Sequence, residues 1–272
     1  MNPVIIYHAD CVDGFTAAWA FWRMFGHDAE YVPAHYGDEP PDVRGKDVRI
    51  VDFSYPRELL MSMCDGWRAA NTIRVLDHHK TAAENLRGLE FAEFDMDRSG
   101  ASMAWDYLNP HTARPVLVNY VEDRDLWRWA LPRSKEVSAY IRTVPRVFPL
   151  WDALAAELDE HLDKAANKGA IALRVVEQYV EGKLKSEGRA MIGGHDVRCV
   201  NTTFAVSETV GELAKNEPFA AGWFQKDTGE FVYSLRSRDG GLDVSEIAEE
   251  YGGGGHARAA GFTSDCLLRK VW

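Results

Sequence analysis

The sequence contains little cysteine and no long hydrophobic run. Its 272 residues include four cysteines, and no two of them form a CxxC pair. This scarcity argues against a disulfide framework and against a structural zinc site. No stretch approaches the roughly 18 consecutive apolar residues of a membrane span, and the N-terminus lacks the basic and apolar pattern of a signal peptide. We therefore expect a cytoplasmic protein with no membrane partner.

Positive charge is also scarce. The chain has 31 Lys and Arg against 42 Asp and Glu, a formal net charge of −11. Binding to duplex nucleic acid depends on neutralising many phosphates, so we expect no stable duplex binding. Small phosphorylated substrates stay compatible with this charge if local cations or metal ions offset the acidic groups. No GxGxxG motif follows the first predicted strand, which disfavours a nicotinamide enzyme.

The first half of the chain has the pattern of an α/β domain. Runs rich in Val and Ile predict strands at 3–7, 48–53 and 72–77, and helical patterns occupy 14–26 and 55–70. Because the predicted strands are apolar on both faces, we expect a parallel sheet covered by helices.

In the second half of the chain the predicted secondary structure changes twice. A mostly helical stretch precedes a new series of predicted strands, with a hairpin turn at 227–229. We therefore expect an α/β domain at 1–130, a helical connector at 131–189 and a smaller α/β domain at 190–272. In that last domain, four glycines and a histidine at 252–256 would allow close backbone approach to an anion, helped by the N-terminus of a following helix.

Ionisable residues gather where the predicted strands end. They are His8, Asp10 and Asp13 after the first strand, Asp52 after the second, and Asp77, His78 and His79 after the third. Because the carboxyl ends of parallel strands meet at one edge of a sheet, these residues should face a single site. An acidic segment at 119–127 could add Asp123 or Asp125. The alternative is that each of these residues is an ordinary polar cap at the end of its own strand and that they form no common site.

So many carboxylates repel one another unless divalent cations neutralise them. Mixed His and Asp ligation suits Mn²⁺, with Zn²⁺, Fe²⁺ and Co²⁺ as less selective alternatives, whereas an all-oxygen Mg²⁺ site would not need the histidines. Two cations bridged by one carboxylate are a known arrangement for displacement at phosphorus. We expect two Mn²⁺ ions, with Mg²⁺, Co²⁺ or Zn²⁺ as alternatives.

The order of these motifs resembles the DHH phosphoesterase superfamily, in the branch with a DHHA1 domain. The resemblance covers about residues 3–130 and 190–262 and includes the C-terminal "GGGGH". It implies a parallel-sheet DHH domain joined by a helical linker to a smaller α/β DHHA1 domain, with the active site in the cleft.

The resemblance also implies a role for each matching residue. The metal ligands would be His8, Asp10, Asp13, Asp52, His78 and Asp123, with Asp52 as the bridging ligand. One extra residue separates Asp10 from Asp13 relative to the family pattern. Asp123 is preferred to Asp125 because it comes first after the apolar run. His79 would face the substrate phosphate, and Asp77 would orient an imidazole.

Further residues would hold the substrate. They are Arg98, Ser99, Arg236, Gly254, Gly255 and His256. Ser99 could instead be a plain helix cap, and Arg98 a solvated surface residue. Trp127 and Trp129 flank an arginine beside the last acidic motif, where they would either stack on a nucleobase or belong to the core.

The function that follows is that of a metal-dependent phosphohydrolase. It would cleave phosphodiester or phosphomonoester bonds of short single-stranded oligonucleotides or (di)nucleotides, in the manner of an oligoribonuclease or exonuclease. One alternative is a non-catalytic nucleotide or nucleic-acid binding module on the same fold. Another is an inorganic pyrophosphatase, which would need a basic C-terminal domain. The physiological substrate, the cleavage polarity and the oligomeric state, including a homodimer, stay open.

Overall fold

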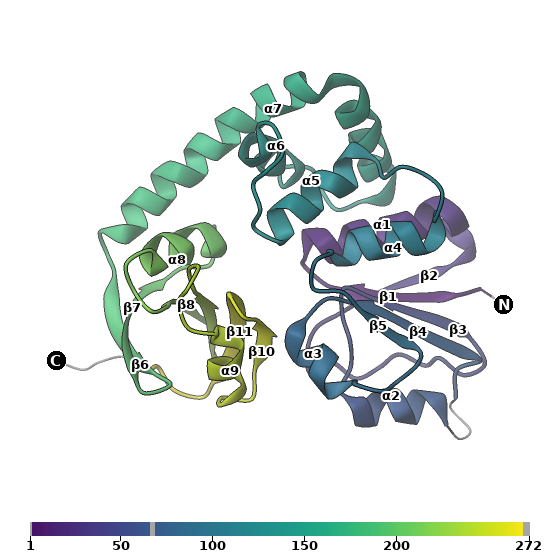
Figure 1. Cartoon of the computed structure of the whole chain (residues 1–272), viewed down its shortest axis with the longest axis horizontal. Helices are drawn as coiled ribbons and strands as arrows, with labels where there is room; N and C mark the ends of the chain where they lie inside the picture. Colours follow the sequence, from purple (N-terminus) through teal and green to yellow (C-terminus); the bar gives the residue numbers. More distant parts are fainter. Residues whose placement is uncertain (1, 66–68, 269–272) are drawn as a thin grey trace. The chain divides into compact units, whose positions relative to one another are not determined.

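The chain divides into two compact units, Met1–Leu173 and Arg174–Trp272. The computed structural model describes residues 2–65 and 69–268. Figure 1 shows the elements of each unit along the chain.

The first unit is built on a parallel five-stranded sheet in the order β2-β1-β3-β4-β5. Its strands are β1 (Val4–His8), β2 (Glu30–Ala34), β3 (Asp47–Val51), β4 (Thr72–Asp77) and β5 (Ala92–Phe94). In the centre of the sheet Tyr7 lies opposite Val51, and Val51 lies opposite Leu76. This register brings the carboxyl ends of β1, β3 and β4 to one edge.

Helices cover both faces of this sheet. Ile5 of β1 packs into a core with α1 (Val12–Phe25) and α4 (Gly100–Leu108). Its neighbours Val4 and Ile6 face the opposite core, which includes residues of α2 (Arg57–Cys64) and follows the alternation of side chains along a strand. Figure 1 shows α1 and α4 on one side of the sheet, with α2 and α3 (Lys80–Asn85) on the other. The predicted parallel α/β class is confirmed.

The remaining helices of the first unit extend one of these cores. They are α5 (Val116–Asp125), α6 (Ser134–Ile141) and the first part of α7 (Phe148–Leu184), and a short 3-10 turn, η1 (Gly26–Asp28), follows α1. Trp151 and Leu154 of α7 are buried in the same core as α1. A Cβ on Gly169 would lie 1.8 Å from the carbonyl oxygen of Glu136, so α7 crosses α6 at a place where only glycine fits.

The helical segment expected at 131–189 contains α6 and α7. The backbone of α7 departs from helical geometry at His161, where φ is −139°. The boundary between the two units falls inside α7, after Leu173. The three-part division of the chain stays a prediction.

The second unit is a six-stranded mixed sheet in the order β10-β11-β9-β8-β7-β6. Its strands are β6 (Gly188–Ile192), β7 (His195–Asn201), β8 (Ala220–Gln225), β9 (Phe231–Arg236), β10 (Gly254–His256) and β11 (Ala259–Ser264). Helices α8 (Val206–Ala214) and α9 (Val244–Glu249) contribute to two separate hydrophobic cores. A Cβ on Gly222 of β8 would lie 2.7 Å from Val210, so glycine lets α8 pack closely on the sheet.

The sequence located most strands but missed several. The strands expected at 3–7, 48–53 and 72–77 correspond to β1, β3 and β4, whereas β2 and β5 had no clear signal. The helix expected at 55–70 is shorter, because α2 ends at Cys64, and residues 66–68 of that prediction lie outside the described residues.

The helix expected after the four glycines is absent and that prediction is wrong. The glycine run leads instead into the antiparallel pair β10 and β11, in which His256 lies opposite Ala259. Gly255 has φ 143°, and a Cβ there would lie 2.6 Å from the carbonyl oxygen of Ala259. The glycines therefore allow two strands to approach closely, and between them and residue 268 the structure has no helix N-terminus.

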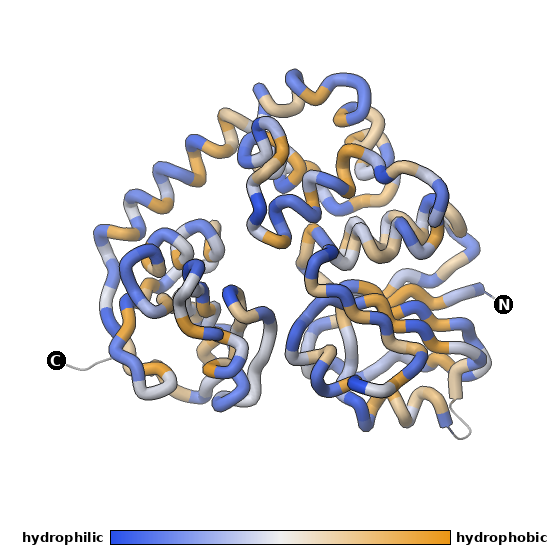
Figure 2. Tube along the Cα trace, viewed as in Figure 1, coloured by the Kyte–Doolittle hydropathy of each residue, from blue (hydrophilic) through white to orange (hydrophobic). Residues whose placement is uncertain are grey.

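Hydropathy follows this architecture. Figure 2 shows hydrophobic residues concentrated in the strands of the first unit and alternating with hydrophilic residues along α7. Among the described residues, no helix combines the length and the apolar character needed to cross a bilayer.

Candidate metal centre

Asp52 lies at the centre of the site, directly after β3. Its φ is 54°, a left-handed conformation that is uncommon for a residue other than glycine. Two helices close around it: a Cβ on Gly100, the first residue of α4, would lie 2.4 Å from Cβ of Asp52, and a Cβ on Gly14 of α1 would lie 3.1 Å from its Oδ2. Backbone strain of this kind concentrates at functional sites.

A first group of candidate ligands surrounds the imidazole of His78. Its Nε2 atom lies 3.1 Å from Oδ1 of Asp52, 3.7 Å from Oδ2 of Asp13 and 3.5 Å from Oδ2 of Asp125. His78, Asp52 and Asp13 are buried. One ligand atom from each of these three residues lies within 4.8 Å of the others, a spacing that could hold one cation.

A second group shares Asp52 with the first. His8, Asp52 and His79 also place one ligand atom each within 4.8 Å of the others. Oδ2 of Asp52 lies 3.6 Å from Nδ1 of His8, and this buried oxygen accepts no hydrogen bond within the described part of the chain. A buried carboxylate oxygen in this state fits a cation. Asp52 would therefore be shared by two cations if both groups held one.

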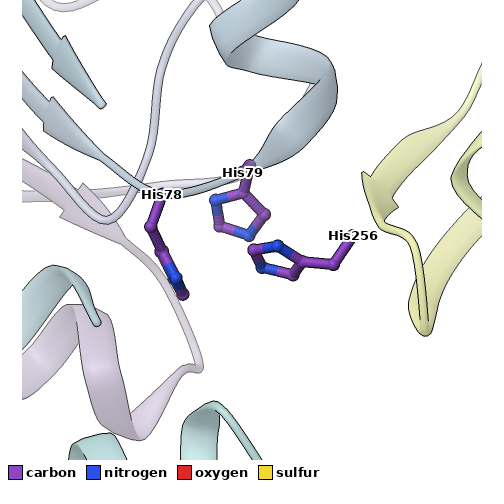
Figure 3. Close-up of side chains that lie close together, drawn as sticks. All are labelled: His78, His79 and His256. Carbon is purple, nitrogen blue, oxygen red and sulfur yellow. The ribbon is translucent and has the colours of Figure 1, made fainter. Parts of the chain in front are cut away.

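The two adjacent histidines leave β4 in different directions. Figure 3 shows His78 and His79 after the strand, with ring centroids 4.9 Å apart. Nδ1 of His79 lies 2.7 Å from Oδ1 of Asp77, which is fully buried. Asp77 therefore holds His79 through one ring nitrogen and leaves Nε2 as the atom that can face a ligand. His256, drawn in the same figure, comes from β10 of the second unit.

The electrostatics of the first group show why a cation would stabilise it. Burial and the charges of Asp52 and Asp125 raise the pKa of Asp13 well above its ordinary value. Burial opposes the charged form of Asp52, but the hydrogen bond to His78 and the nearby imidazole of His8 hold its pKa well below the usual range. For His78 burial acts to lower the pKa, and the hydrogen bond to Asp52 with the nearby carboxylates raises it well above the ordinary value. Three carboxylates, those of Asp13, Asp52 and Asp125, therefore surround a single imidazole, that of His78.

The first turn of α4 positions Asp13. The amide of Gly100 donates to Oδ2 of Asp13 at 2.6 Å, and that of Ala101 donates to Oδ1 at 3.1 Å. The first amides of a helix have no partner within the helix, so a carboxylate is well placed there. Ser99 is the N-cap and accepts from the amide of Ser102 at 3.3 Å. Ser99 is fully buried in this role, which agrees with the helix-cap interpretation.

Asp125, rather than the expected Asp123, lies beside His78. The carboxylate of Asp123 accepts hydrogen bonds from the amide of Ala130 at 2.9 Å and from the hydroxyl of Ser134, so it holds the loop after α5. Two residues of a helix are separated by about 200° around the axis. The aspartates therefore point to opposite sides of α5, and the structure places Asp125, the alternative that the sequence left open, beside His78.

Two further expected residues also lie apart from these groups. Asp10 has a side chain that is 81% exposed, and its carboxylate lies 3.3 Å from His35 and 3.4 Å from Arg146. The extra residue before Asp13 turns Asp10 outward, with φ 53°. Arg98 pairs with Asp106 at 2.8 Å, so a carboxylate already compensates the charge that was expected to meet a phosphate.

In the second unit, the structure aligns two expected substrate residues. Ala259 of β11 lies opposite Arg236 of β9 on one side and opposite His256 of β10 on the other. Residues in register across strands point to the same face of a sheet. Arg236 and His256 therefore share one face, with the small Ala259 between them and with Gly254 and Gly255 in the same strand as His256. Arg236 also donates to the hydroxyl of Ser207 on α8 at 2.8 Å.

Two glycines near the site are required by close packing: Gly14 by the carbonyl oxygen of His8, and Gly100 by Asp52. The sequence interpretation missed one residue, Glu122, which is a buried acceptor for Arg114 and Arg128. Nothing in the sequence distinguishes Glu122 from a surface glutamate.

Comparisons with known proteins identify a family domain in the second unit and two similar sequences. A family model for the DHHA1 domain matches residues 200–267. An uncharacterized protein of Acanthamoeba polyphaga mimivirus is 29% identical over 284 residues, which cover 95% of this chain and 66% of the viral protein. Oligoribonuclease NrnB of Bacillus subtilis is 26% identical over 211 residues, covering 71% of this chain and 53% of NrnB. The matches thus span about half to two thirds of these relatives.

Solved structures show the same fold at low sequence identity. The DHH domain of a protein described as a member of a ribosomal-protein family has a TM-score of 0.57 at 14% identity, covering 96% of this chain and 82% of that one. The pGpG-specific phosphodiesterase PggH of Vibrio cholerae has a TM-score of 0.51 at 13% identity, covering 96% and 92%. Residues 200–267 therefore match a DHHA1 domain, and the chain shares its fold with DHH-domain proteins, in agreement with the resemblance carried by the DHH motif after β4.

Proposed function

We propose that the protein is a divalent-metal-dependent phosphohydrolase that cleaves short single-stranded oligonucleotides or dinucleotides. The observation that carries the proposal is the pair of ligand groups that share Asp52. A carboxylate common to two groups is what a two-cation site needs, and such sites serve displacement at phosphorus. The printed activities of the relatives, an oligoribonuclease and a pGpG-specific phosphodiesterase, support this substrate class.

The donor set fits divalent cations of the Mn²⁺ type. Asp13, Asp52, His78 and Asp125 would hold one cation, and His8 with Asp52 would hold the other. Mixed nitrogen and oxygen donors favour Mn²⁺ over Mg²⁺, with Co²⁺ and Zn²⁺ as the alternatives. When bound, the cations would offset the crowded carboxylates and supply Lewis acidity toward water and a phosphoryl oxygen.

His79 is the proposed contact to the reacting phosphate. Asp77 holds its Nδ1 atom at 2.7 Å, which fixes the orientation of the ring. His79 also places a ring nitrogen within 4.8 Å of ligand atoms of His8 and Asp52, so its imidazole lies where a phosphate oxygen near these residues could meet it. A fixed imidazole needs no reorganisation when the substrate binds.

Arg236 and His256 are the proposed contacts of the second unit to the substrate. Their positions on one face of the sheet, on either side of Ala259, present two nitrogen-bearing side chains to the same ligand. The small side chain between them and the glycines of β10 leave room for a phosphate or nucleotide. We propose that these residues bind a part of the substrate away from the reacting bond.

The charge of the chain favours short substrates. With a net charge of −11, a long duplex would gain few contacts and meet repulsion along its length. We propose stepwise cleavage to mononucleotides. A cytoplasmic location stays a prediction of the sequence.

The two alternative functions are less well supported. A non-catalytic binding module has no need for two ligand groups that share a carboxylate. An inorganic pyrophosphatase would need a basic C-terminal domain, and residues 200–267 match a DHHA1 domain instead.

A substrate panel tests the proposed function. The Mn²⁺-loaded protein is incubated with single- and double-stranded oligonucleotides of two to about thirty nucleotides, with pyrophosphate included and products resolved by chromatography. The expected result is the highest kcat/KM on the shortest single strands and loss of activity in the Asp52→Asn variant. Turnover of pyrophosphate alone, or no turnover of any phosphoester, would overturn the proposal.

A further inference from the structure

The loop after α5 presents an exposed pair of tryptophans. The ring centroids of Trp127 and Trp129 lie 4.9 Å apart at 73°. Trp127 is 45% exposed and Trp129 is half-buried. Trp127 is thus not a core residue, which excludes the core alternative for it. A large exposed aromatic ring calls for an explanation in binding when its surroundings hold it in place.

The backbone keeps this loop in an unusual conformation. Both tryptophans have left-handed φ values, 55° for Trp127 and 52° for Trp129. The carbonyl oxygen of Asp123 accepts from the amide of Arg128 at 2.8 Å, and the carboxylate of Asp123 accepts from the amide of Ala130 at 2.9 Å. Strain of this kind persists only where the surroundings enforce it, and it is common at ligand-binding sites.

The arginine between the tryptophans is held by the protein. Arg128 pairs with the buried Glu122 at 3.2 Å and donates to the carbonyl oxygen of Asp97. Its guanidinium therefore ties the loop to Glu122 and to the backbone at Asp97, although the side chain of Arg128 is still 42% exposed. A rigid loop of this kind has little conformational entropy to lose when a ligand binds.

The tryptophan pair lies close to the candidate metal centre. Asp125, whose Oδ2 is 3.5 Å from His78, precedes Trp127 by two residues. Since consecutive Cα atoms are about 3.8 Å apart, the Cα atoms of these two residues are separated by no more than about 7.6 Å. Both residues belong to the first unit, so this proximity involves one compact unit alone.

Cations accompany both rings. The guanidinium carbon of Arg124 lies 5.8 Å from the ring centroid of Trp127, and Nζ of Lys135 lies 5.9 Å from that of Trp129. Aromatic surface with adjacent positive charge is the combination that binds single-stranded nucleotides, because bases stack on the rings while cations attract phosphates.

We propose that Trp127 and Trp129 form a stacking platform for a nucleobase of the substrate. This deepens the proposed function and rests on it, because the platform would hold the nucleotide whose phosphate reaches the metal centre. It also gives a reason for a preference for single strands, since a base paired in a duplex does not expose its face. Stacking recognises any base, so the platform would select nucleotides without selecting sequence.

The test compares substrates with and without a base. Kinetic constants are measured for a dinucleotide and for its abasic sugar-phosphate counterpart, with wild type, Trp127→Ala, Trp129→Ala and Trp127→Phe. We expect Trp127→Ala to raise KM for the dinucleotide by roughly 10- to 100-fold with KM for the abasic diester unchanged. Trp127→Phe should restore much of the loss.

Tyr107→Ala is the matched control. Tyr107 is an exposed aromatic residue, 42% accessible, with Arg74 at 6.0 Å from its ring, and it lies in the last turn of α4. Its loss should leave both substrates unaffected. Equal changes of KM on the two substrates for Trp127→Ala, or no change on either, would overturn the stacking platform while the hydrolytic function stands.

A binding readout separates this proposal from the proposed function. Quenching of tryptophan fluorescence is titrated with the dinucleotide and the abasic diester, using wild type and Trp127→Phe. We expect base-dependent quenching that is largely lost in the variant. If the protein hydrolyses no phosphoester, the proposed function fails, and base-dependent quenching still decides whether the platform exists. Equal quenching by both ligands would refute it.

Discussion

Replacing Gly100 by alanine should damage the metal centre, although alanine is the better helix former. A Cβ at this position would lie 2.4 Å from Cβ of Asp52 and 2.8 Å from its Cα. Carbon atoms pack best at about 3.5–4.0 Å, so the two segments must separate by about 1 Å. Overpacking of this kind costs about 1–3 kcal/mol, whereas glycine to alanine in a helix ordinarily gains about 0.5–1 kcal/mol. We expect a net loss of stability.

Gly182→Ala is the matched control for this change. Gly182 lies in α7, is exposed, and an added Cβ would meet no atom within 4 Å. Its replacement should stabilise the protein by about 0.5–1 kcal/mol, because only the helix propensity changes. The free energy of unfolding is measured by urea denaturation, following the transition of the unit that carries each change.

Metal affinity provides the second assay of Gly100→Ala. Displacement of Asp52 by about 1 Å should weaken Mn²⁺ binding in titration calorimetry and lower kcat by on the order of 100-fold. If Gly100→Ala were as stable as Gly182→Ala and bound Mn²⁺ like wild type, then α4 would not approach Asp52 as the structure shows. The bridging geometry would then have to be abandoned.

Three further predictions address individual residues. Asp52→Asn should retain the circular dichroism of wild type but lose turnover and at least one bound Mn²⁺, since an amide cannot balance two cations; full metal stoichiometry in this variant would contradict the bridge. Asp125→Asn should weaken Mn²⁺ binding with little change in stability, whereas Asp123→Asn should cost about 1–3 kcal/mol of stability and retain Mn²⁺ affinity; the reverse pattern would restore Asp123 as the ligand. Arg236→Ala and His256→Ala should raise KM for a dinucleotide but leave hydrolysis of bis-p-nitrophenyl phosphate largely intact, and equal losses on both substrates would place these residues at the reacting bond.

The sequence predicted the elements whose pattern is local. Strands β1, β3 and β4 were recognisable because they are central, buried on both faces and rich in Val and Ile. The strands it missed lie at the edges of this sheet: β2 contains Pro33 and is only partly buried, and β5 has three residues. Edge strands tolerate proline and polar residues, so their sequences resemble loops.

The glycine run shows how one local pattern can serve two structures. Four glycines before a histidine suit a loop that leads into a helix, and they equally suit a strand that needs close approach to its neighbour. The choice depends on β11, whose carbonyl at Ala259 would lie 2.6 Å from a Cβ on Gly255. That contact arises from the pairing of β10 with β11, so the composition of the glycine run alone could not predict it.

The candidate site was predictable where a residue follows a strand and unpredictable where it lies on a helix. His8, Asp52 and His78 come at or directly after strand ends, so the parallel sheet alone brings them to one edge. The last carboxylate comes from α5, where two residues of separation reverse the direction of a side chain. Asp123 and Asp125 are equally acidic and both follow the same apolar run. In the structure the two aspartates have different partners. Asp123 accepts hydrogen bonds from the loop that carries the tryptophans, and Asp125 lies beside His78. One short acidic segment therefore supports the proposed base platform with one aspartate and the proposed metal centre with the other, so an error in either position would displace both sites together.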